Sequence, residues 1–101
     1  METLQLKAYL GKDLAPDTFG EAVIFIGVFW HGELQDCVCA ADTESSRKWM
    51  GSYEMFSIAN QMGMIDTGYA NPIAHEFIKQ PDLQLLWEED VEGKKVYHTT
   101  H

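Results

Sequence analysis

The chain has 101 residues, with sixteen Asp and Glu against seven Lys and Arg and a formal net charge of −9. So acidic a domain repels nucleic-acid backbones and anionic membranes, and its field steers it toward positively charged surfaces. The length suits one hydrophobic core, and the apolar content of 46% indicates a folded chain. We therefore expect a single domain over residues 1–101 that binds neither nucleic acid nor membranes directly.

The first forty residues carry three patterns typical of β-strands. Residues 3–10 alternate between apolar and polar side chains, which predicts a half-buried strand. Residues 11–20 are rich in Gly, Asp and Pro and indicate a loop, which we expect Phe19 to anchor. Residues 21–31 are apolar at both alternating sets of positions, so this strand needs cover on both faces, from helices on one and from loops, another subunit or a partner on the other. A glycine turn then predicts an antiparallel hairpin into residues 34–41.

Helical patterns occupy the middle of the chain. Capping-type residues at 42–44 predict a long helix over residues 44–62, whose apolar surface is wide and includes Trp49 and Tyr53. An Asn-Pro pair predicts a second, short helix over residues 72–79.

Two further strands are predicted near the end of the chain. They occupy residues 83–87 and 95–99, and an acidic turn at 88–93 joins them. The whole pattern predicts an α+β fold in the order βββααββ. It has one mostly antiparallel sheet of about five strands, with both helices on one face.

The candidates for catalysis or metal binding are weak. Cys37 and Cys39 lie in an apolar strand, where small buried thiols are the commoner interpretation. A zinc site made of these cysteines with His98 and His101 has the wrong spacing, and His75-Glu76 lacks the second histidine of a zinc-protease motif. No serine has a hydrolase motif around it, and the glycines form no phosphate-binding pattern. We expect no cofactor, no metal and no catalysis.

The strongest interaction feature is the acidic segment near the end of the chain. Its carboxylates with a neighbouring aromatic side chain combine a charged rim with an apolar anchor, as protein interfaces do. The alternative is a solvated turn that keeps the protein soluble. The predicted contact residues are Glu88, Glu89, Asp90, Glu92 and Trp87, with Trp49 and Tyr53 of the long helix as a second group.

Three function classes are compatible with the sequence. The first is a non-enzymatic inhibitor or modulator that occludes a basic surface of a larger protein, such as a nucleic-acid-binding surface, and is similar in type to small acidic phage inhibitors of host defence nucleases. The second is a self-associating subunit of a viral or macromolecular assembly, in which a homodimer covers the two-faced strand. The third is a small cysteine- or metal-dependent enzyme. The first ten residues show no signal-peptide pattern, so we expect a cytoplasmic protein, in the host cytoplasm if it is viral.

Overall fold

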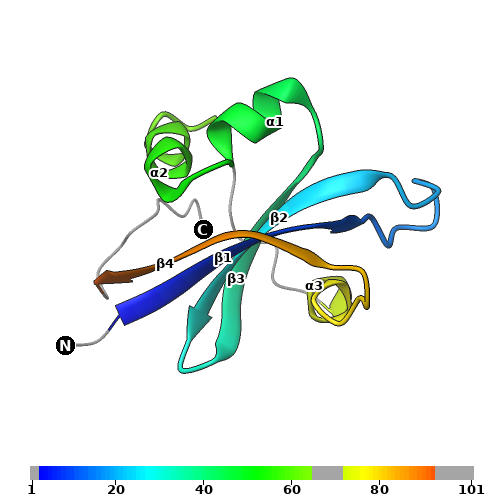
Figure 1. The fold of residues 1–101 in the computed structure, drawn as a ribbon, viewed down its shortest axis with the longest axis horizontal. Helices are drawn as coiled ribbons and strands as arrows, with labels where there is room; N and C mark the ends of the chain where they lie inside the picture. Colours follow the sequence, from blue (N-terminus) through cyan, green and yellow to red (C-terminus); the bar gives the residue numbers. More distant parts are fainter. Residues whose placement is uncertain (1–2, 65–71, 93–101) are drawn as a thin grey trace.

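Three strands follow one another at the start of the chain, and a fourth joins them near its end (Figure 1). The computed structural model describes residues 3–64 and 72–92. The elements are β1 (Thr3–Lys12), β2 (Ala22–Trp30), β3 (Glu33–Ala41), α1 (Glu44–Trp49), α2 (Tyr53–Gln61), α3 (Pro72–Phe77) and β4 (Gln84–Glu92). They form one antiparallel sheet in the order β3-β2-β1-β4, with β4 pairing beside β1. The α+β class and the antiparallel sheet are therefore confirmed.

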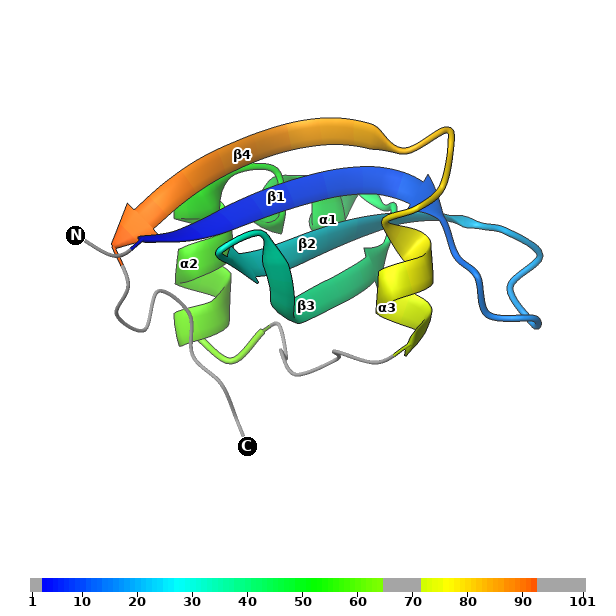
Figure 2. The ribbon, with the colours of Figure 1, turned by 90° about the horizontal axis from the view of Figure 1, so that it is seen from below.

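Strand β2 is the centre of the core, and residues 23–29 are buried along its whole length. Alternation of its side chains divides the core into two clusters. The larger cluster joins Ile24, Ile26 and Val28 to Met50 and Phe56 of the α1–α2 region. The smaller joins Val23 and Phe25 to Ala74 and Phe77 of α3. Helices α1 and α2 thus cover one face of the sheet, and α3 lies on the other (Figures 1 and 2). The prediction that both helices lie on one face is therefore wrong.

The remaining apolar surface of β2 is covered within the chain. The Phe77 ring stacks on Phe25 with centroids 4.6 Å apart. Beyond it, the ring of Phe29 lies over Gly27, where a Cβ would come within 2.7 Å of a ring carbon, and Phe29 is only 8% exposed. The Lys7 ammonium lies 5.5 Å from the Phe29 ring centroid. Residues of the same chain therefore cover the second apolar face of β2, for which the sequence left open loops, another subunit or a partner.

The predicted long helix is two helices, because the chain bends at residues 50–52. Thr43 caps α1 and Ser52 caps α2, each side chain accepting a backbone N–H bond. A side chain at Gly51 would collide with the carbonyl oxygen of Arg47, so the bend requires glycine. The bend turns Met50 into the larger core cluster, where it is buried.

The end of the described chain also differs from the prediction. Residues 88–92 continue β4 and are not a turn: Glu88, Glu89 and Asp90 pair with Lys7, Leu6 and Gln5 of β1. Acidic residues are uncommon in strands, which favoured the turn, but on an exposed edge their charges remain in water. The fifth predicted strand, at 95–99, lies outside the described residues, which form a sheet of four. No helix of the described chain is long and apolar enough to cross a bilayer.

Candidate protein-interaction surface

The acidic strand segment, Glu88–Asp90, lies on β4 at the edge of the described sheet, and its three side chains are exposed. Strand geometry sends Glu88 and Asp90 toward one face and Glu89 toward the other. Gln5 donates its side-chain amide to the Asp90 carboxylate at 3.2 Å. The backbone of Glu92 pairs with Thr3 at the end of the strand. The sheet therefore holds this run of carboxylates on a fixed backbone.

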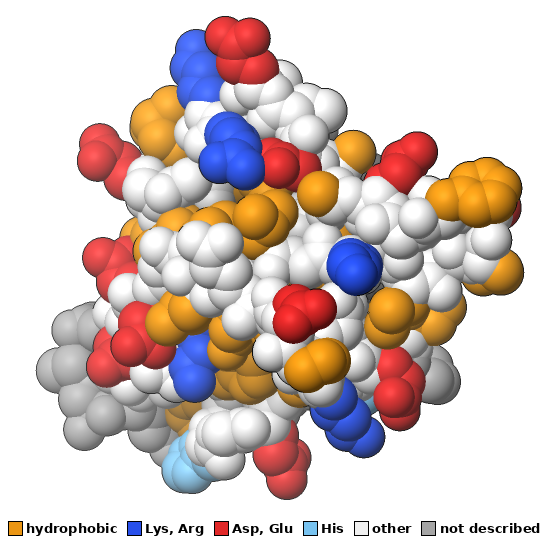
Figure 3. Space-filling model, turned by 45° about the vertical axis from the view of Figure 1, so that its right-hand side comes forward, with side chains coloured by type: hydrophobic (Ala, Val, Ile, Leu, Met, Phe, Trp, Pro, Cys, Tyr) orange, Lys and Arg blue, Asp and Glu red, His pale blue; other side chains and the backbone are white. Residues whose placement is uncertain are grey.

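The local charge of this segment is only partly offset. Lys7 pairs with Glu88 across the strands, but its ammonium lies over the Phe29 ring. Burial and then the Glu88 carboxylate raise the pKa of the neighbouring Tyr9. On the face shown in Figure 3, acidic side chains are scattered among basic and hydrophobic ones and do not form one patch. The acidic strand segment is thus a local concentration of charge on a generally acidic protein.

Trp87 does not serve as the exposed anchor of this segment. It packs against the larger core cluster, and its Nε1 donates a hydrogen bond of 2.9 Å to the carbonyl oxygen of Met50. This bond ties β4 to the bend between α1 and α2. The carboxylates of Glu88–Asp90 therefore follow, along β4, a tryptophan that stabilises the fold.

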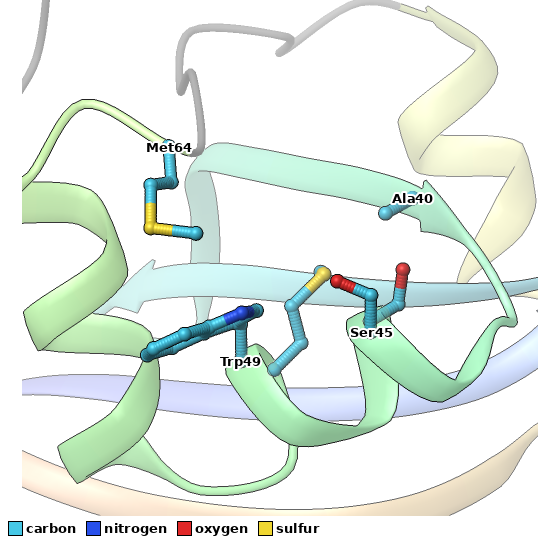
Figure 4. Close-up of a pocket in the computed structure, with 6 residues that line it drawn as sticks. Ala40, Ser45, Trp49 and Met64 are labelled. Carbon is cyan, nitrogen blue, oxygen red and sulfur yellow. The ribbon is translucent and has the colours of Figure 1, made fainter.

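Trp49 and Tyr53 lie on the face of the sheet that α1 and α2 cover. Tyr53 packs half-buried against the larger core cluster. Trp49 lines a shallow pocket of about 150 Å³ over β3 (Figure 4). The other lining residues are Ala40, Ser45, Ser46, Met50 and Met64. Strands β3 and β4 are opposite edges of the sheet, so this pocket and the acidic strand segment form separate sites.

The pocket offers little for small-molecule chemistry. Its volume is below the roughly 300 Å³ at which ligand pockets begin. Beside it, the Lys48 ammonium lies 4.8 Å from the Trp49 ring centroid. Arg47 donates to both carboxylate oxygens of Asp42, at 2.6 and 2.8 Å, and this bonding lowers the pKa of Asp42. The pocket can receive a single side chain of another molecule.

The two cysteines are poorly suited to nucleophilic chemistry. Burial, with Asp36 and Cys39 nearby, raises the pKa of the Cys37 thiol to about 12. Cys39 is exposed as a residue, yet partial burial of its thiol and the Asp13 carboxylate raise its pKa to about 11. Both thiols are thus protonated near neutral pH. Within residues 3–64 and 72–92, no three His, Cys, Asp or Glu side chains form a metal-binding group, and His98 and His101 lie outside this part.

The β1–β2 loop carries an exposed aromatic residue that the sequence did not predict. Phe19, expected to anchor the β1–β2 loop, is 96% exposed, so that expectation is wrong. Its backbone has a φ of +56°, in the turn that the Glu21 N–H closes on the Thr18 carbonyl. A Phe-Gly pair in a Pro- and Asp-rich loop was the available signal, but hydrophobicity alone favoured burial.

In comparisons with known proteins, no protein-family model, no curated protein and no solved structure matches this chain.

Proposed function

We propose that this chain is a small, acidic, non-enzymatic protein-binding module that attaches to a basic surface of a larger protein and occludes it as an inhibitor or modulator. The observation that supports the proposal is the acidic strand segment. Glu88, Glu89 and Asp90 are exposed on an ordered edge strand. A sheet-held segment loses less conformational freedom on binding than a flexible turn would, so more of its charge attraction is retained as affinity.

Occlusion would work by electrostatic competition. Glu88 and Asp90 are two residues apart on one strand, so their Cα atoms are about 7 Å apart along it. Such a row of like charges attracts Lys and Arg clusters of the kind that bind phosphate backbones. The proposed target is therefore a protein with a basic, nucleic-acid-binding type of surface. The similarity in type to phage anti-defence inhibitors belongs to this proposal, as does a site of action in the cytoplasm, or the host cytoplasm for a viral protein.

The alternatives have less support. Self-association rested on the uncovered face of β2, and α3 with Phe29 covers that face within the chain. A cysteine enzyme needs a thiolate, and the raised pKa values of both thiols oppose one. Two free cysteines are also compatible with a reducing compartment such as the cytoplasm.

The test is a quantitative pull-down from the source or host cells at roughly 50 to 300 mM salt, the range over which interactions between exposed charges become screened. The variant Glu88→Gln/Glu89→Gln/Asp90→Asn removes three charges from the acidic strand segment. The matched control removes three exposed charges elsewhere, by Glu33→Gln, Glu54→Gln and Asp82→Asn. We expect the first variant to bind its partner about tenfold or more weakly and with less salt dependence, since three rim charges contribute roughly 0.5 kcal/mol each. Equal retention of the partner by both variants would refute the proposal.

A further inference from the structure

The β1–β2 loop, residues 13–21, projects beyond the sheet and the helices in both ribbon views (Figures 1 and 2). Hydrophobic side chains protrude on the same side of the space-filling view (Figure 3). Phe19 is 96% exposed, far more than the other exposed large apolar residues of the described chain. Leu14 of the same loop is also exposed. A nearly bare aromatic ring on a projecting loop is the feature of this surface that most needs explanation.

The backbone around Phe19 is unusual for such a residue. Thr18 and Glu21 close a turn, with the Glu21 N–H donating to the Thr18 carbonyl at 3.2 Å. Phe19 and Gly20 have φ values of +56° and +74°, which is the type I′ pattern. Asn, Asp and Gly are preferred at these positions, and a bulky residue there is an outlier. The fold thus holds Phe19 in a disfavoured conformation that gives its ring no packing within the chain.

The loop is firmly rooted. The Asp13 N–H donates to the Glu21 carbonyl at 2.8 Å across the loop base. Thr18 donates its hydroxyl to the Ala15 carbonyl at 2.7 Å. The Gln80 side chain bonds both backbone groups of Lys12, accepting from its N–H at 3.0 Å and donating to its carbonyl at 2.8 Å. Phe19 is therefore presented on an ordered support, which reduces the entropy lost on binding.

The charges around Phe19 indicate what it would contact. Asp17 and Glu21 are exposed on either side of it in the chain, and Asp13 lies at the loop base. These carboxylates would be repelled by anionic lipid headgroups and by a second copy of this acidic chain. They complement an apolar socket whose rim carries Lys or Arg.

We propose that Phe19 is the docking anchor of this protein, inserting into an apolar socket with a basic rim on the partner. This inference rests on the proposed protein-binding function and supplies the aromatic contact that Trp87, held in the core, does not. The acidic strand segment begins opposite Lys7, and the loop follows Lys12, so about 17 Å of β1 separates them. The loop extends further, past that end of the sheet (Figure 1), so a partner that takes both contacts must span most of the length of β1 and the loop beyond it.

The first experiment places the photo-crosslinker p-benzoylphenylalanine at position 19 of the full chain and irradiates it in extract of the source or host cells. The control places it at Ile58, which is 41% exposed on α2. The expected result is one protein crosslinked from position 19 and not from position 58, through a peptide that lies in an apolar site flanked by Lys or Arg. Crosslinks only to lipid, only to a second copy of this chain, or equally from both positions would overturn the inference.

The second experiment measures binding of that purified protein across a salt series. We expect Phe19→Ala to weaken binding about 30-fold or more at every salt concentration, as removal of an interface hot spot does, without changing the salt slope. The variant Glu88→Gln/Glu89→Gln/Asp90→Asn should flatten the slope instead. An effect of the charge variant alone overturns the Phe19 anchor and leaves the proposed function standing. An effect of Phe19→Ala alone supports the anchor and overturns the acidic mechanism. Circular dichroism of Phe19→Ala verifies that the variant folds.

Discussion

Replacing Phe19 by asparagine should stabilise the free protein. A left-handed backbone conformation costs an ordinary L-residue about 1–2 kcal/mol, whereas asparagine tolerates it. At 96% exposure, the Phe19 ring contributes no packing that the change would remove. The variant also creates Asn-Gly, the preferred pair for a type I′ turn. We expect a gain of about 1 kcal/mol in the free energy of unfolding, which raises Tm by roughly 4–8 °C in a domain of this size.

Phe19→Ala is the control for this prediction. It removes the same ring but keeps a Cβ in the left-handed region, so its free energy of unfolding should stay within about 0.5 kcal/mol of the parent's. His31→Asn is a second control, because His31 has a φ of +51° at the equivalent place in the β2–β3 turn. Histidine tolerates this conformation better than phenylalanine does, so the gain there should be smaller.

The assay is urea unfolding followed by circular dichroism, with the m value checked for constancy, together with a thermal melt. The reasoning is refuted if Phe19→Asn is no more stable than Phe19→Ala, because relief of backbone strain would then be absent. Together with the binding experiment, the expected result shows a residue that lowers the stability of the free chain and strengthens the complex.

Four further predictions concern the core and the Cys39 thiol. Trp87→Phe should lower the free energy of unfolding by about 1 kcal/mol, because the hydrogen bond to the Met50 carbonyl is lost, and Trp87→Ala should lower it by about 3 kcal/mol. An unchanged stability of Trp87→Phe in urea unfolding would contradict the role of this bond. Phe77→Ala should lower the free energy of unfolding by about 3 kcal/mol, since it removes the stack on Phe25. A loss below about 1 kcal/mol would argue that the packing of α3 on this face of the sheet is not essential. With a pKa of about 11 against an ordinary 9.0, Cys39 should react with iodoacetamide about 100-fold more slowly at pH 7 than a cysteine peptide, and an equal rate would contradict the raised pKa. Because the folded state keeps this proton longer, stability should fall as pH rises from 9 through 11, and Cys39→Ala should reduce that fall in pH-dependent unfolding.

The first half of the fold could be predicted because local signals agree there. Alternation in residues 3–10 and the doubly apolar strand at 22–30 indicate strands, and the turn at His31-Gly32 makes β2 and β3 neighbours. The hairpin into β3 is confirmed, with Trp30 opposite Glu33 beside the turn and a shift of register between Val28 and Phe29.

The remaining features depend on information that periodicity does not carry. The apolar pattern continues through Met50, so the bend after α1 was hidden although Gly51 and Ser52 mark it. Periodicity also shows which residues of α3 are apolar but not which face of the sheet they cover. The acidic residues of β4 were assigned to a turn because their strand pairing depends on β1, far away in the chain.

For the candidate site, the sequence located the acidic segment, and the aromatic residue predicted beside it packs against the larger core cluster. Trp87 has a strand position and a ring large enough to anchor an interface, yet the same properties suit it to the core. Hydrophobicity favours burial of Phe19, yet Phe19 lies in a turn with positive φ and is exposed. Exposure here follows from backbone conformation, which composition does not encode.

The two hydrogen bonds between the Gln80 side chain and the Lys12 backbone have a consequence for protein engineering. One carboxamide meets both backbone groups of a residue at the end of β1, much as a neighbouring strand would, while the bond between Asp13 and Glu21 closes the loop just beyond it. Apart from the Thr18 hydroxyl, which bonds the Ala15 carbonyl, the contacts that frame the seven residues 14–20 do not involve the side chains of these residues. Such a frame tolerates exchange of its contents, so foreign recognition peptides can be grafted there for display without redesign of the sheet.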